Sequence, residues 1–147
     1  MKKLITAMFI FVSCFTSKAF SDGHAIKMGI ILGFTGPIES LTPAMAASAE
    51  LAFKEASDSG KLLGGKSIMI ERADSTCVDS AAATTAAEGL VSNGVLAIMG
   101  ADCSGVTGAI ATNVAVPNGV VMISPSATSP GLTAVSYTHL RAHETKT

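Results

Sequence analysis

Three segments of the chain hold the side chains whose types and spacing could do chemistry. Cys77 and Cys103 could pair with each other or supply a thiolate. The segment Asp102–Gly105 joins a carboxylate, a thiol and a hydroxyl, and Ser124–Pro130 places four hydroxyls beside two prolines. The middle of the sequence has no Ser–His–Asp arrangement, no motif of paired carboxylates and no metal-ligand cluster. The segments therefore favour ligand binding over catalysis, and they indicate no metal and no cofactor.

The two cysteines allow two interpretations. Cys14 falls in a predicted export signal, and the even count of two cysteines that remains is typical of a disulfide in an exported protein. The alternative is a nucleophilic Cys103, for which His24 is the one available base once both ends of the chain are set aside. We expect a structural disulfide, because His24 falls next to the predicted start of the mature chain.

The two polar segments also keep alternatives open. Asp102–Gly105 falls between a predicted strand and a predicted helix, where free backbone N–H groups suit a carboxylate. Ser104 could instead serve only as a helix cap. Ser124–Pro130 follows a predicted strand and reads equally well as a rigid ligand loop or as an ordinary turn.

The glycine-rich run Gly60–Ser67 matches the letters of a P-loop. A P-loop needs a strand before it and a helix after it, so that N–H groups face the phosphates. Here a predicted helix precedes the run and a predicted strand follows. We therefore do not expect nucleotide binding.

The elements that position these segments alternate between strand and helix. Apolar runs predict strands, and 3.6-residue periodicity predicts the helices between them. The expected strands span 26–33, 67–72, 95–99 and 120–123, and the helices 42–59, 79–92 and 104–114. Right-handed crossovers then predict an α/β fold, a parallel sheet with helices on both faces. Ligands of such sheets bind beyond the carboxyl ends of the strands, where loops 34–41, 101–104 and 124–130 lie.

Three local features of the helices can also be predicted. Thr42 should cap the first helix, with Pro43 at its first position. Glu50 and Lys54 are spaced to form an ion pair on its outer face. Asp79 or Ser80 should cap the second helix.

Residues 1–21 read as a cleaved secretory signal peptide. Lys2 and Lys3 precede a short apolar run, and the small residues before Asp22 suit cleavage there. A lipoprotein would instead be cut before Cys14, but the preceding residues match a lipobox only weakly. The run is shorter than the roughly 20 apolar residues that span a bilayer. We expect an exported protein.

Residues 135–147 break abruptly from the composition before them. The string 135–145 resembles the translation of a common transposase sequencing adapter. We expect it to be read-through rather than native sequence. His139 and His143 have a helical metal-ligand spacing, but they belong to this string.

Composition narrows the classes of function. Charged residues are 14% of the chain, 48% are hydrophobic and the net charge is −1. Disorder is therefore not expected. Residues 22–134 hold five basic and ten acidic side chains, a net charge of −5. The absence of a basic patch argues against nucleic acid as a partner.

Five pieces of the sequence carry a family resemblance. They are Ile26–Gly33 with Thr35-Gly36-Pro37, Gly64-Gly65-Lys66, Asp74–Cys77, Gly100–Gly105, and Met122–Pro130. With these pieces, residues 26–133 resemble the N-terminal lobe of periplasmic substrate-binding proteins. Those proteins serve ABC importers for branched-chain and other aliphatic amino acids. The resemblance assigns residues 22–134 to a truncated first lobe of a type I periplasmic binding fold.

The resemblance also implies roles for particular residues. Cys77 and Cys103 form a disulfide, and Ser104 binds the α-carboxylate of the ligand. Ala127 and Thr128 hold the α-carboxylate and α-ammonium through backbone and hydroxyl groups. Leu41 takes a position often held by a larger aromatic residue, which leaves aliphatic amides and short ureas as further ligands.

The resemblance finally implies a mode of action. Two lobes close on the ligand, and an inner-membrane permease with its ATPases reads the closed form. The protein would be periplasmic and not an enzyme. A ligand-sensing ectodomain of a receptor or regulator with the same fold is the alternative.

Overall fold

A computed structural model describes residues 25–133 of the chain. The predicted signal peptide with Cys14, and the adapter-like string, lie outside the described residues. The described elements are β1 (Ile26–Leu32), α1 (Thr42–Asp58), η2 (Leu62–Gly64), β2 (Ile68–Asp74), α2 (Ser80–Ser92), β3 (Ala97–Gly100), α3 (Ser104–Ile110), the π-helical η3 (Ala111–Ala115), β4 (Val121–Ile123) and η4 (Pro130–Leu132).

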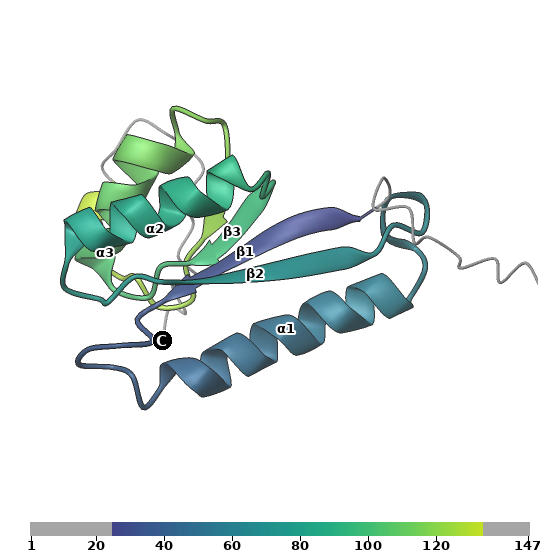
Figure 1. Ribbon diagram of the computed structural model, residues 1–147. Helices are drawn as coiled ribbons and strands as arrows, with labels where there is room; N and C mark the ends of the chain where they lie inside the picture. Colours follow the sequence, from purple (N-terminus) through teal and green to yellow (C-terminus); the bar gives the residue numbers. More distant parts are fainter. Residues whose placement is uncertain (1–24, 134–147) are drawn as a thin grey trace, which may run out of the picture.

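The strands form one parallel sheet in the order β2-β1-β3-β4. β1 pairs with β2 from Ile26 opposite Ile68 to Leu32 opposite Asp74, and its other edge pairs with β3. Figure 1 shows α1 along one face of the sheet, with α2 and α3 on the opposite face. The predicted α/β architecture is therefore confirmed.

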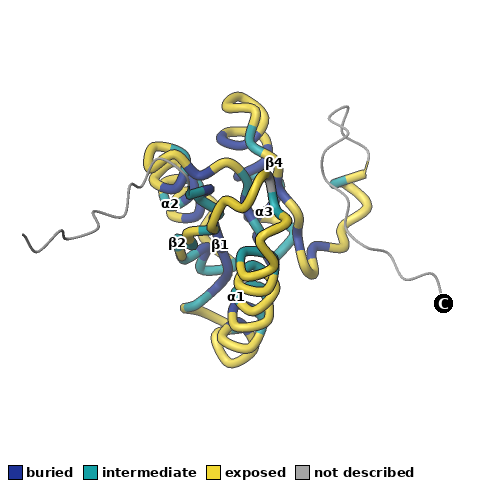
Figure 2. The backbone as a smooth tube through the Cα atoms, turned by 90° about the vertical axis from the view of Figure 1, so that its right-hand side faces the viewer, coloured by how far each residue is buried: buried dark blue, intermediate teal, exposed yellow. Residues whose placement is uncertain are grey.

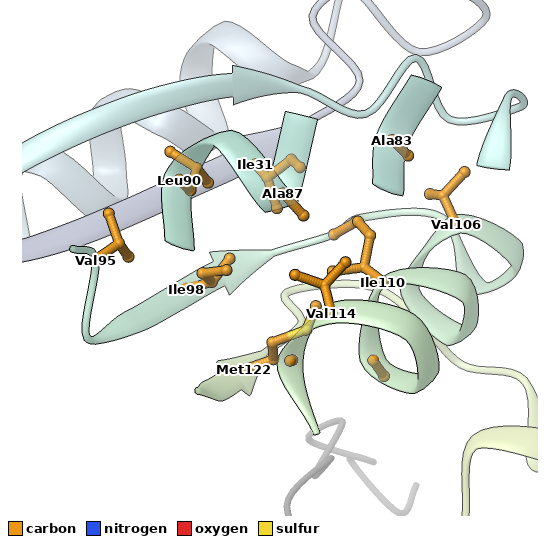
Figure 3. Packing of buried hydrophobic residues seen from close by; sticks show 13 residues of the cluster. Ile31, Ala83, Ala87, Leu90, Val95, Ile98, Val106, Ile110, Val114 and Met122 are labelled. Atoms are coloured by element: carbon orange, nitrogen blue, oxygen red, sulfur yellow. The ribbon is translucent and has the colours of Figure 1, made fainter. Parts of the chain in front are cut away.

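Strand side chains alternate between two cores on the two faces of the sheet. Ile31, Ile98 and Met122 pack with α2 and α3, whose contact residues are mostly alanine and valine (Figure 3). Ile30 and Leu32 pack under α1. Alternation along parallel strands explains why both faces are apolar.

Helix α1 covers only part of its face. Its buried residues are Thr42 and Ala46, and Figure 2 shows much of the helix exposed. At the edge of the sheet opposite β2, strand β4 buries Met122 but leaves Val121 and Ile123 46% and 60% exposed. The α1 face is thus open over β4.

Two predictions about α1 are wrong. The residue that caps it is Leu41, without a side-chain hydrogen bond, and the Thr42 hydroxyl instead donates to the Gly33 carbonyl at 3.2 Å. Glu50 does not pair with Lys54. It accepts a hydrogen bond from Arg72 Nε at 2.5 Å, and Lys54 pairs with Asp58.

The second and third helices follow the sequence more closely. Asp79 caps α2, because its carboxylate accepts from the N–H groups of Ala81 and Ala82. The third helix begins at Ser104 as predicted, but after Ile110 it continues as the π-helical turn η3.

The Gly60–Ser67 run lies between α1 and β2, the reverse of the order that a P-loop needs. Across residues 25–133, helices are too short or too polar to cross a bilayer.

Candidate functional site

The strand order places a switch point between β1 and β3. The chain leaves β1 toward β2 on one side and later returns to β3 on the other, so the loops after β1 and β3 diverge. A crevice at such a point, beyond the carboxyl ends of the strands, is where open α/β sheets bind ligands. The loops that begin at Gly33, Ala101 and Ser124 all lie at this edge.

The structure brings three of the predicted ligand residues together. The Ser104 hydroxyl oxygen accepts hydrogen bonds from the backbone N–H groups of Thr128 and Ser129, both at 3.1 Å. Ala127 is fully buried, and its N–H donates to the Ser124 hydroxyl at 2.9 Å. The start of α3 therefore holds the loop that follows β4.

Leu41 is placed differently from these three residues. It ends the loop after β1, and its side chain is 60% exposed. Its backbone N–H bonds to Ile38 within its own loop. The structure leaves its predicted role as a proposal.

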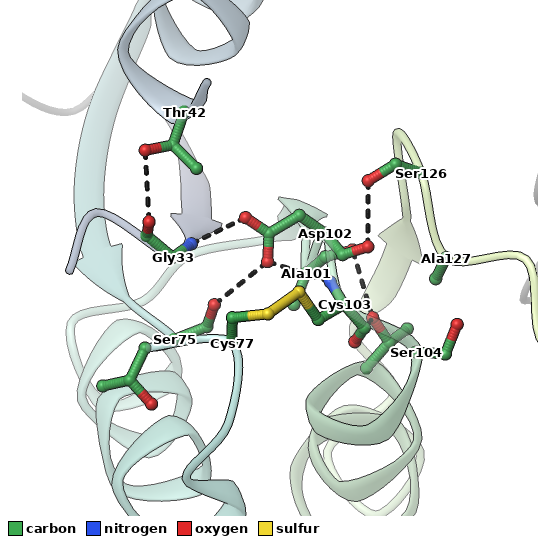
Figure 4. The surroundings of a disulfide bond; sticks show 12 residues. Gly33, Thr42, Ser75, Cys77, Ala101, Asp102, Cys103, Ser104, Ser126 and Ala127 are labelled. Carbon is green, nitrogen blue, oxygen red and sulfur yellow. Dashed lines mark hydrogen bonds between the residues drawn. A yellow bond between two sulfur atoms is a disulfide. The ribbon is translucent and has the colours of Figure 1, made fainter. Parts of the chain in front are cut away.

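The predicted disulfide is present between Cys77 and Cys103, whose Cα atoms are 5.2 Å apart (Figure 4). It joins the connection after β2 to the connection after β3. With its sulfur bonded, Cys103 does not supply the thiolate of the nucleophile interpretation.

A hydrogen-bonded carboxylate links the loop after β1 to the end of β2. Asp74 accepts from the Thr35 hydroxyl at 2.6 Å and from the Thr76 N–H at 2.8 Å. Partial burial raises the pKa of the Asp74 carboxyl. The bonds from the Thr35 hydroxyl, the Thr76 N–H and other backbone N–H groups outweigh that effect, so the pKa lies below its usual value.

Asp102 is a buried carboxylate to which sequence reasoning assigned no role of its own. It is 3% exposed and accepts hydrogen bonds from the Gly33 N–H at 2.7 Å, the Cys103 N–H at 2.9 Å and the Ser75 hydroxyl at 3.3 Å (Figure 4). The signal that could have identified it is an acidic residue two positions after a buried strand.

The groups at this edge could hold a small polar molecule. The edge offers hydroxyls, backbone groups and a partly buried disulfide. Within residues 25–133, no group of three or more His, Cys, Asp or Glu side chains is placed to hold a metal ion. A parallel sheet with such loops at its switch point is typical of ligand-binding α/β folds.

Comparison with known proteins then gives the family. A profile described as a periplasmic binding protein matches residues 25–146, and the chain belongs to this family.

Named relatives agree with that membership. A Leu/Ile/Val-binding protein of Rhizobium johnstonii is 30% identical over 94% of this chain and 36% of its own length. The Leu/Ile/Val-binding protein of Escherichia coli K12 is also 30% identical, over 76% of this chain and 30% of its own. Both relatives are named as binding proteins, which is the class that the sequence predicted, and not as enzymes.

Solved structures share the fold. The isoleucine complex of a branched-chain amino acid transporter substrate-binding protein from Streptococcus pneumoniae is 34% identical. It superimposes with a TM-score of 0.67 over 74% of this chain and 31% of its own. An ABC transporter substrate-binding protein from Desulfitobacterium hafniense, in complex with Leu, is 28% identical, with a TM-score of 0.66 over 79% and 33%. The chain thus spans about a third of these relatives.

Proposed function

We propose that this chain is the first lobe of an extracytoplasmic solute-binding component of an ABC importer. Its ligand would be a branched-chain or related aliphatic amino acid or amide, bound between two lobes that close on it. The observation that carries the proposal is the meeting of Ser104 with the Ala127–Thr128 loop at the carboxyl edge of the sheet, beside its switch point. The solutes named for the S. pneumoniae and D. hafniense structures, isoleucine and Leu, are of this class.

Each proposed contact uses a group that the fold presents at this edge. The Ser104 hydroxyl lies at the start of α3, where helix N–H groups favour an anion, and it would donate to the α-carboxylate. The Ala127 N–H is already bonded to Ser124, so its carbonyl would accept from the ammonium. The exposed Thr128 hydroxyl would contact either group. Leu41 would leave more room in the site than an aromatic side chain would. Amides and short ureas are therefore further candidate ligands.

Transport would depend on closure. A ligand shifts the equilibrium toward the closed state only as far as it binds that state more tightly. The inner-membrane permease and its ATPases would be the partners that respond to the closed form. The lobe would act in the periplasm, where an exported protein can keep the Cys77–Cys103 disulfide.

Calorimetry on the complete protein that carries this lobe tests the proposal. Leu, Ile, Val and short aliphatic amides form the panel. We expect at least one of them to bind, and Ser104→Ala to raise its Kd by about tenfold or more, because the α-carboxylate of the ligand loses a hydrogen-bond donor. Ser48→Ala is the matched control, since Ser48 bonds to Ala44 within α1 and should leave Kd within about twofold.

A panel without a ligand would count against the proposal, as would equal Kd values for the two serine variants. No observation specific to this chain favours the alternative of a receptor ectodomain.

A further inference from the structure

Asp102 touches the loops that follow all three of the other strands. Its carboxylate accepts from Gly33, directly after β1, and from Ser75, directly after β2. Its backbone carbonyl accepts from the Ser126 hydroxyl, in the loop after β4, at 2.9 Å. Figure 4 shows these contacts converging on Asp102 from three directions. Among the described residues, it lies at the centre of the carboxyl edge.

The two carboxylate oxygens of Asp102 accept hydrogen bonds from different sides of the switch point. Oδ2 takes the short bond from the Gly33 N–H on the β1 side. Oδ1 takes the Cys103 N–H of its own loop and the Ser75 hydroxyl on the β2 side. A carboxylate can accept at both oxygens at once, whereas an amide has one accepting oxygen and a donating NH2 group. Asparagine at this position would therefore set an NH2 group against an N–H donor.

The buried carboxylate of Asp102 depends on hydrogen bonds that come partly from other loops. Asp102 is 3% exposed, and the ion pairs recorded within residues 25–133 do not include it. Burying such a group is unfavourable unless hydrogen bonds compensate. An apolar side chain would avoid that penalty but would leave the buried Gly33 N–H without its acceptor. What the carboxylate adds is a fixed distance between the loop that begins at Gly33 and the loop after β3, which the Cys77–Cys103 disulfide does not join.

We propose that Asp102 is a positioning residue that fixes the loop beginning at Gly33 and the Ser104–Ser129 pair relative to each other. It contacts none of the groups assigned to the ligand. Through Gly33, it acts on the loop that ends at Leu41. Through Ser126 it acts on Thr128, and through Cys103 it acts on Ser104. The consequence for ligand affinity rests on the proposed function, but the consequence for the loops does not.

Amide hydrogen exchange on the 147-residue chain tests the placement of the loops without a ligand. In Asp102→Asn, we expect exchange at Thr128 and Ser129 to accelerate about tenfold relative to Ile30 and Ile98 in the core strands. Neither amide bonds to Asp102, so acceleration there reports loosening of the loop. Referencing to the core removes any uniform loss of stability.

Thr107→Val is the matched control. The buried Thr107 hydroxyl bonds to the Ala101 and Cys103 carbonyls, inside one connection and not between loops. We expect its ratio of loop to core exchange to stay within about twofold of the wild type. If Asp102→Asn fails to fold, Ser126→Ala removes only the bond to the Asp102 carbonyl. It should then accelerate Thr128 and Ser129 while sparing Gly33.

Uniform acceleration of loop and core in Asp102→Asn would overturn the proposal, because it would show a purely structural residue. So would unchanged exchange at Thr128 and Ser129 in both Asp102→Asn and Ser126→Ala.

The complete protein then separates the two proposals. If the wild type binds a ligand, Asp102→Asn should raise Kd about tenfold while Thr107→Val stays within about twofold. An equal Kd for Asp102→Asn and wild type overturns the role of Asp102 in ligand positioning. If the wild type binds nothing but the exchange result holds, the proposed function fails and the placement of the loops by Asp102 stands.

Discussion

The pKa of a single carboxyl makes the edge of this lobe sensitive to acid. The pKa of Asp74 is lowered in the folded chain, net of burial, by bonds from Thr35 and Thr76. In the unfolded chain the pKa should be near the ordinary value of about 3.9. A lowered folded-state pKa means that ionised Asp74 stabilises the fold above that value. The contribution is lost as pH falls through the folded-state pKa.

We therefore predict that Asp74→Asn lowers the free energy of unfolding by about 1 kcal/mol at pH 7, the scale of a lost charged hydrogen bond at a partly exposed site. The difference from wild type should shrink below about pH 4. Urea unfolding between pH 3 and pH 7 measures it. Thr35→Ser keeps the hydroxyl and should retain the pH dependence, whereas Thr35→Val should lose part of it. A difference that grows on acidification would refute this assignment.

The disulfide joins the segment before α2 to the segment before α3. Cys77 lies before α2 and Cys103 before α3, with a sequence separation of 26. Chain entropy predicts that such a crosslink stabilises the fold by about 3.5 kcal/mol. Thr76 and Cys77 adopt left-handed backbone angles, with φ of 55° and 70°, which offsets part of that gain.

The double variant Cys77→Ala/Cys103→Ala should therefore lose roughly 2–3.5 kcal/mol of unfolding free energy, measured in urea. Reduction of the wild-type chain is the independent comparison and should give a loss of similar size. A loss below about 1 kcal/mol by both routes would mean that native contacts alone hold the two connections.

Local signals predicted the order of elements well. Asp79 caps α2 because its carboxylate reaches N–H groups two and three residues ahead, a contact confined to its own turn. The Cys77–Cys103 pairing also followed from the even cysteine count behind a predicted export signal.

Features that depend on tertiary contacts were not predictable in the same way. Glu50 has a suitable partner four residues ahead, yet it bonds to Arg72 across the β2 face, 22 residues away. Thr42 has the residue type of a cap, but the nearby Gly33 carbonyl takes its hydroxyl. Asp102 could be read only as part of a motif, because its partners come from separate connections.

For the whole molecule, the apolar face of β4 predicts self-association of the 147-residue chain. Val121 and Ile123 are exposed on β4, which is the edge strand of the sheet within residues 25–133. Such edges are templates for pairing with another chain. Ile123→Thr keeps strand propensity and should raise the monomer fraction in sedimentation velocity, with unfolding free energy changed by less than about 0.5 kcal/mol. An unchanged distribution of sizes would place the association elsewhere.

The proposed site on this lobe is too small to enclose a ligand by itself. Ser104, Ala127 and Thr128 lie at one edge of one lobe, and a small ligand held there alone would keep much of its surface in water. Binding sites usually bury most of a ligand, and closure adds the contacts that distinguish the bound state. We predict that the 147-residue chain binds Leu or Ile at least about 100-fold more weakly than a protein with the proposed second lobe. NMR titration of the chain and calorimetry of the complete protein make the comparison. Equal affinities would show that this edge is a sufficient site by itself, and closure would then be unnecessary for recognition.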